Sequence, residues 1–194
     1  MGYRIRPPRR TTPRGWPEGS ADGLTEPFDP LHALRVLDDH RVRFVVIGGF
    51  AADLLGAPLN TSDLDVCYEQ SPVNTVRLAA ALNELGAARR TDRVDSEAPF
   101  VLDGPTLAAG ESFTFDTLAG SVDIVAIPRG TAGFPDLVAK AITVPTGDFT
   151  VPVVALADLM RMKRAGVRIK DKMQLEVLAA LQEMIEEAEQ NTPT

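Results

Sequence analysis

Cysteine, histidine and long apolar runs are all scarce in this 194-residue chain. The single cysteine, Cys67, excludes a disulfide within the chain and is typical of a reducing compartment, so we expect a cytoplasmic protein. No apolar run approaches the roughly 20 residues of a membrane-spanning helix, and the N-terminal arginines are not followed by the apolar stretch of a secretory signal. The two histidines, His32 and His40, fall in one expected helix, which argues against a histidine-based phosphohydrolase.

Charge is unevenly distributed along the chain. The net charge is −7, yet residues 1–20 contain five arginines and one acidic residue, so the remainder is strongly acidic. A polyanionic ligand would therefore have to meet a local basic patch or a metal ion. Residues 1–27 are rich in Arg, Pro, Gly and Thr without an apolar period, which predicts a disordered arm. We favour a plain solvated tail, with a nucleic-acid-binding arm as the alternative.

The order of apolar periods predicts an α+β fold with α/β character, in which helices flank a mixed sheet. Helices are expected at 31–40, 50–55, 72–85, 134–141, 156–164 and 170–189, and strands at 43–47, 63–68, 100–102, 113–116, 121–127 and 149–154. We expect a core at residues 28–155 and C-terminal helices, residues 156–194, packed on it.

The segment Asp63-Leu64-Asp65 opens one of these expected strands. Side chains alternate between the two faces of a strand, so both carboxylates point the same way. Neighbouring carboxylates repel each other, and a cation between them removes that cost; oxygen ligands favour Mg²⁺ or Mn²⁺. Two exposed loop aspartates are the alternative, since this short motif is common. Cys67 follows on the same face and is interpreted as a packing residue.

Gly48-Gly49 lies between the preceding strand and a helix. Glycines there leave backbone N–H groups open at a helix N-terminus, where a phosphate can approach closely. Alone, the pair is more typical of a plain turn. Because the two aspartates follow after thirteen intervening residues, the pair predicts a triphosphate site beside a metal site.

Asp123 stands inside the apolar strand 121–127. A carboxylate in such a strand is costly unless it is paired or bound to a metal ion. We interpret Asp123 as the third acidic ligand, and a buried ion pair with an arginine is the alternative.

Together these features resemble the nucleotidyltransferase superfamily with a polymerase-β-like core, and most closely the small bacterial AbiEii/MenT-type enzymes, many of them toxins of toxin–antitoxin pairs. Thr61-Ser62-Asp63-Leu64-Asp65 matches the metal motif, residues 154–166 are similar to a characteristic helix, and Arg168-Ile169-Lys170-Asp171 to the element after it. The resemblance covers about residues 31–185. Leu59, where related chains often have arginine, and an additional Val167 depart from it.

Six cations fall within twelve residues: Arg161, Lys163, Arg164, Arg168, Lys170 and Lys172. Helical spacing places Lys163 at the edge of the apolar stripe, pointing partly inward, where it can reach a triphosphate. A solvated charged face accounts better for Arg161 and Arg164. Asp171 either orients a neighbouring lysine or is an N-terminal helix acid.

The resulting hypothesis is metal-dependent transfer of a nucleoside monophosphate from an NTP to an acceptor hydroxyl. Asp63, Asp65 and Asp123 would hold Mg²⁺ or Mn²⁺, and Asp123 would also take the acceptor proton. Phosphates would bind at Gly48, Gly49, Thr61, Ser62, Lys163, Arg168 and Lys170, with Asp171 beside them. The resemblance suggests a tRNA 3′ end as acceptor, reached through the basic cluster, and a cognate antitoxin as partner. A protein hydroxyl and a small aminoglycoside-like molecule are the alternative acceptors. A catalytically silent nucleotide-binding module or antitoxin partner of the same fold is the alternative.

Overall fold

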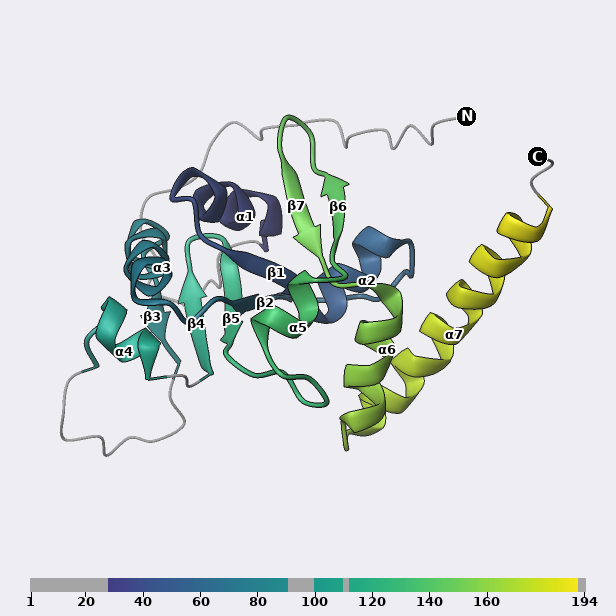
Figure 1. The fold of residues 1–194 in the computed structure, drawn as a ribbon. Helices are drawn as coiled ribbons and strands as arrows, with labels where there is room; N and C mark the ends of the chain where they lie inside the picture. Colours follow the sequence, from purple (N-terminus) through teal and green to yellow (C-terminus); the bar gives the residue numbers. More distant parts are fainter. Residues whose placement is uncertain (1–27, 91–99, 110–111, 192–194) are drawn as a thin grey trace, which may run out of the picture.

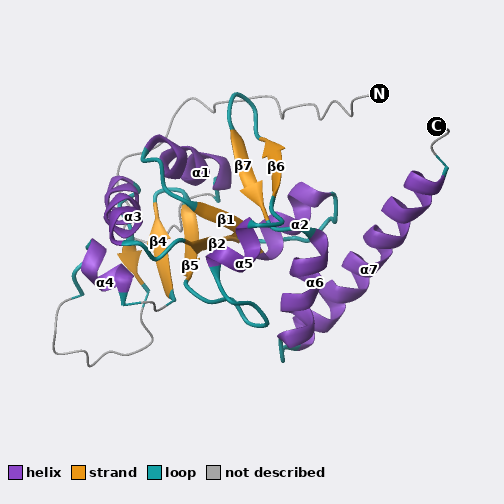
Figure 2. Ribbon diagram, viewed as in Figure 1, coloured by secondary structure: helices purple, strands orange, loops and turns teal. Residues whose placement is uncertain are grey.

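A computed structural model describes residues 28–90, 100–109 and 112–191. In these residues one mixed sheet has the strand order β3-β4-β5-β2-β1-β7-β6 (Figure 1). Its strands are β1 (Phe44–Ile47), β2 (Asp63–Tyr68), β3 (Ala88–Arg89), β4 (Phe113–Thr117), β5 (Gly120–Val125), β6 (Ile142–Pro145) and β7 (Thr150–Val153). The pairs β2–β5 and β1–β7 are parallel and the others are antiparallel. The expected α+β fold, with helices flanking a mixed sheet, is confirmed (Figure 2).

The helices pack around this sheet and on one another. They are α1 (Pro30–Asp39), α2 (Gly48–Leu55), α3 (Pro72–Glu84), α4 (Gly104–Ala108), α5 (Phe134–Val138), α6 (Leu156–Ala165) and α7 (Ile169–Gln190). α1 packs on α3, α2 lies against β1 and β2, and α6 packs on both α2 and α7. Within the described part of the chain, no helix is long and apolar enough to cross a membrane.

The burial of the central strands β1 and β2 agrees with the pattern of apolar and polar residues in the sequence. All four residues of β1 are buried, as expected for a β-branched run covered on both faces. In β2, Leu64 and Val66 are fully buried, while Asp63 and Asp65 are only partly buried. Cys67 is also fully buried, and burial raises the pKa of its thiol to about 12, which fits a packing residue.

Several predicted boundaries were wrong. Residues 100–102 are not a strand: the Phe100 ring packs against Phe113 and Phe115, and Asp103 caps α4 by accepting a hydrogen bond from the Thr106 backbone N–H (2.9 Å). The strand expected at 121–127 ends at Val125, shortly before Pro128, and the helix expected at 134–141 ends at Val138.

Two edge strands were not predicted. β3 has only two residues, too few to show a period, and β6 is a four-residue, largely exposed strand that ends in a proline. The predicted arm, residues 1–27, lies outside the described residues. The division into a core and C-terminal helices at residue 155 stays a prediction.

Candidate active site

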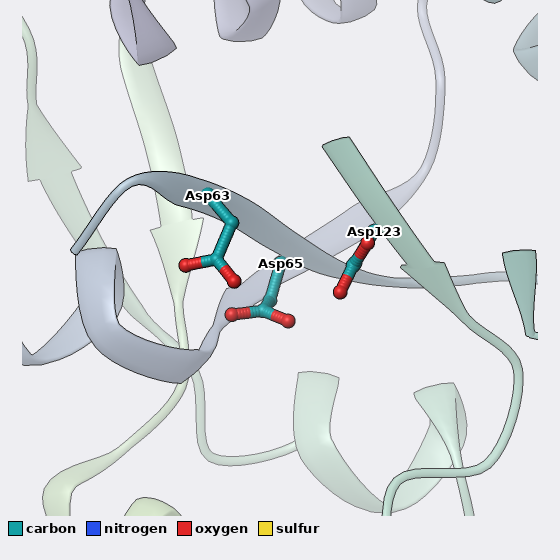
Figure 3. A group of neighbouring side chains, drawn as sticks. All are labelled: Asp63, Asp65 and Asp123. Atoms are coloured by element: carbon teal, nitrogen blue, oxygen red, sulfur yellow. The ribbon is translucent and has the colours of Figure 1, made fainter. Parts of the chain in front are cut away.

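Three aspartates meet where β2 and β5 lie side by side. The parallel register places Asp65 directly beside Asp123, and Asp63 precedes Asp65 on the same face of β2. Figure 3 shows the three carboxylates converging, and one oxygen from each lies within 4.8 Å of the others. Asp63 Oδ1 accepts a hydrogen bond of 2.6 Å from the Thr61 hydroxyl, which fixes its orientation. The sheet register thus gathers carboxylates that are about 60 residues apart in sequence.

The electrostatics of this cluster are unfavourable without a counter-charge. Burial raises the pKa of Asp65 to about 7, the charges of Asp63 and Asp123 add to the shift, and Lys163 and Lys170 oppose it. Burial also raises the pKa of Asp123. Asp123 Oδ1 is buried and has no hydrogen-bond partner among the described residues. The cluster therefore has the chemistry of a cation site, since a cation would compensate the charge and fill the vacant acceptor position.

Replacing Asp65 by asparagine should stabilise the metal-free protein, and more so as the pH rises. A carboxyl group whose folded-state pKa is raised holds its proton in the folded chain where the unfolded chain has lost it. Stability conferred by the wild-type group therefore falls between about pH 4 and pH 7 and is constant above. We expect Asp65→Asn and wild type to be equally stable near pH 4, and the variant to be more stable by on the order of 2 kcal/mol at pH 8.

Urea unfolding in EDTA at both pH values measures this difference. The exposed Asp116→Asn is the control for the substitution itself, because Asp116 lies on β4 and outside the acidic cluster. A wild-type protein that is the more stable of the two at pH 8 would contradict the assignment of Asp65 to a strained carboxylate cluster.

Gly48 and Gly49 form the start of α2, two residues earlier than predicted, directly beside the acidic cluster. Gly48 has a φ of +72°, and a Cβ there would overlap the carboxylate of Asp65. A Cβ on Gly49 would come within 2.7 Å of the Thr61 hydroxyl oxygen. Both glycines are thus required by the close approach of β2, which keeps the helix N-terminus next to the carboxylates.

Lys163 and Asp171 form the opposite side of the site. Lys163 Nζ donates to Asp171 Oδ1 at 3.3 Å, and both side chains are more than four-fifths buried. Asp171 Oδ2 also accepts from the backbone N–H of Arg168, so one carboxylate joins α6 to the turn before α7. A Cβ on Gly166 would overlap this carboxylate. Both interpretations of Asp171 hold, because it orients Lys163 and also lies in the first turn of α7, where it accepts from a backbone N–H at the helix start.

A cavity of about 290 Å³ joins the acidic cluster to these cations. The cavity is lined by all the residues that the sequence predicted except one: Gly48, Gly49, Thr61, Asp63, Asp65, Asp123, Lys163, Arg168, Lys170 and Asp171. The exception, Ser62, is exposed and does not line it. The side chain of Lys163 is inward-pointing, whereas Arg164 is exposed, as helical spacing predicted.

Solved structures share this arrangement of helices and strands. The lincosamide antibiotic adenylyltransferase LnuA, in its lincomycin-bound crystal structure, is 11% identical, with a TM-score of 0.54 over 78% of this chain and 94% of that chain. The solution structure of the antibiotic-resistance factor ANT(2'')-Ia is 12% identical, with a TM-score of 0.50 over 83% of this chain and 89% of that chain. The chain has the nucleotidyltransferase fold. No protein-family model and no curated protein matches it by sequence.

Two polar side chains that the sequence did not predict also line the cavity, those of Arg129 and Gln174. Arg129 lies in the loop after β5, which folds back until Gly130 contacts α6; no local pattern marks such a return. Gln174 is 6% exposed, and its Oε1 is buried without a partner among the described residues. Gln174 could have been predicted from the sequence, because it lies one helical turn after Lys170 and therefore on the same face of the helix.

Arg161 corrects one interpretation of the basic cluster. It does not belong to a solvated face: its guanidinium pairs with Asp136 at 2.7 Å and with the buried Asp158 at 2.9 Å. Asp158 is only 3% exposed, so its negative charge depends on its cationic partners, of which Arg161 is nearer than Lys140 (3.9 Å). Arg161 is therefore committed to fixing α6 against α5, and it is not a free cation for an external ligand.

Proposed function

We propose that this chain is a metal-dependent nucleotidyltransferase that moves a nucleoside monophosphate from an NTP to an acceptor hydroxyl and releases pyrophosphate. One observation carries the proposal: three converging carboxylates share a cavity with a helix N-terminus and several cations. The nucleotidyltransferase fold supports it. A hydrolase or a kinase would also bind a nucleotide, so identifying the reaction products is what distinguishes a nucleotidyltransferase from these two classes of enzyme.

Asp63, Asp65 and Asp123 are the residues that would hold the divalent ion. The donor set consists of carboxylate oxygens alone, which fits Mg²⁺ or Mn²⁺ better than zinc. The unpartnered Asp123 Oδ1 and the raised pKa of Asp65 are both relieved by a cation at this position. When bound, such an ion supplies positive charge for the triphosphate and lowers the pKa of the acceptor hydroxyl.

The residues around the carboxylates are suited to binding the triphosphate. The backbone N–H groups at the start of α2 are available at Gly48 and Gly49, and the helix dipole favours an anion there. Lys163 and Lys170 face the cavity and would offset the charge that develops on the leaving pyrophosphate. Arg168 and Arg129 extend the same positive wall. We infer that the phosphates lie between α2 and the junction of α6 and α7.

Asp123 is the candidate proton acceptor. Its carboxylate is attached to β5, next to Asp65, and its Oδ1 has no hydrogen-bond partner in the described residues, although the Thr114 side chain hydrogen-bonds to the carboxylate. Burial raises its pKa, and a carboxylate with a raised pKa is a stronger base for the proton of an attacking hydroxyl. Asp63 instead accepts a hydrogen bond from Thr61, so in the proposal Asp63 binds the metal ion only, whereas Asp123 also accepts the proton.

Lys163→Ala should weaken NTP binding by about 10–100-fold, whereas Arg164→Ala should change it by less than about threefold. The two residues are adjacent on α6, but Lys163 lines the cavity and Arg164 is exposed. Isothermal titration with a non-hydrolysable NTP in Mg²⁺ measures both affinities. Equal and negligible losses in the two variants would show that the basic helix is only a solvated face.

For the acceptor we propose an RNA hydroxyl, and specifically a tRNA 3′ end, in an enzyme of the AbiEii/MenT type acting as a toxin. Because the body of the protein is acidic, RNA has to contact local cations. Arg164 remains exposed on α6, and Arg168 remains exposed in the turn between α6 and α7. A small antibiotic-like acceptor is the second candidate, because LnuA, which shares this fold, is a lincosamide antibiotic adenylyltransferase with lincomycin bound in its crystal structure.

Separate incubation of total RNA, total protein and a panel of aminoglycosides and lincosamides with each α-labelled NTP distinguishes these acceptors. We expect label on tRNA, falling steeply as salt rises because phosphate contacts release counterions. Charge reversal at Arg164 should reduce RNA labelling and leave NTP binding intact. Label only on a small molecule would move the proposal to that acceptor. Mg²⁺-dependent NTP binding without pyrophosphate release would instead indicate a catalytically silent module.

A further inference from the structure

One side of α7 exposes a continuous apolar stripe. Ile169, Met173, Val177 and Met184 are 80%, 65%, 37% and 67% exposed, and Ala180 between the last two is exposed as well. Their spacing of three, four and seven residues places all five within one narrow arc of the helix. The stripe extends over about 22 Å of helix, at 1.5 Å per residue.

This stripe is not the side that holds α7 to the rest of the protein. Leu178 is fully buried and Gln174 nearly so, and both lie on a different side of the helix from the stripe. In Figure 1 the N-terminal turns of α7 lie beside α6, and the C-terminal turns extend away from the sheet. A second apolar face on a helix that is already packed on its first face indicates a protein-binding surface.

The charged residues beside the stripe indicate which kind of protein surface would bind to it. Along one flank stand Lys172, Glu176 and Glu183, in that order. The beginning of α7 and the turn before it contain Arg168, Lys170 and Lys172, whereas the end of the helix contains Glu183, Glu186 and Glu187. Lys172 and Glu183 are exposed and form no ion pair within the described residues. A complementary partner is therefore a helix with the same stripe and the opposite polarity of charge.

We propose that α7 pairs with the α7 of a second copy of this chain, in an antiparallel, two-fold symmetric arrangement. The two-fold axis passes close to Val177, near the middle of the stripe. In an antiparallel pair related by such an axis, the same flank of both helices meets, so Lys172 of one copy lies beside Glu183 of the other, twice. A parallel pair would gather the acidic ends of both helices together. The inference does not rest on the proposed reaction.

Sedimentation equilibrium of the full chain over about 1–200 μM tests the pairing. This concentration range is chosen because two helices that meet along a stripe of about 22 Å form a small interface, which supports only weak association. The molar mass should rise from 20.9 kDa towards twice that value with concentration. Met173→Glu places a charge in the stripe and should leave a monomer. Val73→Glu is the matched control: Val73 is 63% exposed on α3, far from the stripe in sequence, and the variant should still dimerise.

Charge exchange tests the antiparallel geometry. Lys172→Glu and Glu183→Lys should each weaken the dimer by about tenfold, and the double variant should regain wild-type affinity because both ion pairs reform with reversed sign. Circular dichroism confirms that each variant is folded. A chain that stays monomeric throughout, or a dimer that Met173→Glu leaves intact, would overturn the proposal. A double variant no better than the single ones would overturn the antiparallel arrangement.

Discussion

Asp63→Asn and Asp65→Asn should each reduce nucleotidyl transfer by at least about 1000-fold in saturating Mg²⁺ while the protein stays folded. Asparagine keeps the shape of the side chain but removes the negative charge that a divalent ion requires. The two side chains extend from one face of β2 into the same cavity, so neither can replace the other without moving the strand. Removing one charge from a repelling cluster should not unfold the chain, and at Asp65 it should stabilise it.

The measurement is pyrophosphate release together with transfer of the α-phosphate label. Asp116→Asn provides the control, since Asp116 lies on β4 and pairs with Arg90 away from the cavity; it should retain full activity. Wild-type turnover by Asp63→Asn or Asp65→Asn would contradict the proposal that these aspartates bind the catalytic metal ion. Loss of activity together with loss of the folded circular dichroism signal would mean that the variant does not report on chemistry.

Gly48→Ala should abolish Mg²⁺-dependent nucleotide binding and lower the free energy of unfolding by about 1–3 kcal/mol. Two effects combine at this residue. A φ of +72° is strained for any residue with a Cβ, and the new methyl group would overlap the carboxylate of Asp65. The helix N-terminus and β2 would have to separate, which moves a proposed metal ligand and the proposed phosphate site at once.

Gly147→Ala separates these two effects. Gly147 has a φ of +93°, but a Cβ there meets no atom within 4 Å. It should therefore show a comparable loss of stability from backbone strain and normal nucleotide binding. Thermal unfolding and isothermal titration of the two variants give the comparison. If both variants bind nucleotide equally well, the contact between Gly48 and Asp65 does not matter for the site.

Much of the fold and of the acidic cluster was predictable because it depends on short-range periods. Alternation along β2 is sufficient to place Asp63 and Asp65 on one face, and the helical spacing of α6 separates the inward Lys163 from the exposed Arg164. Asp123 was expected to join them because a lone acid inside an apolar strand needs a partner. The family resemblance, and not the periodicity, predicted the nucleotidyltransferase fold, which the structure confirms.

Other features depend on contacts between segments that no local pattern encodes. The pairing of Arg161 with Asp136 joins α6 to a residue twenty-five positions earlier, so helical spacing alone left Arg161 on a solvated face. Arg129 enters the cavity only because its loop turns back onto α6. Short edge strands such as β3 have too few residues to show a period. These positions are set by tertiary packing, which overrides local preference.

The most direct test of the central claim compares two labels on the same NTP. The chain is incubated with its acceptor fraction, Mg²⁺ and an NTP that is labelled either at the α-phosphorus or at the γ-phosphorus, with Asp65→Asn in parallel. Nucleotidyl transfer places the α-label covalently on the acceptor and leaves the γ-label in pyrophosphate, and Asp65→Asn does neither. Transfer of the γ-label to the acceptor, or release of free phosphate without any labelled acceptor, would contradict nucleotidyl transfer and indicate a kinase or a hydrolase on this fold.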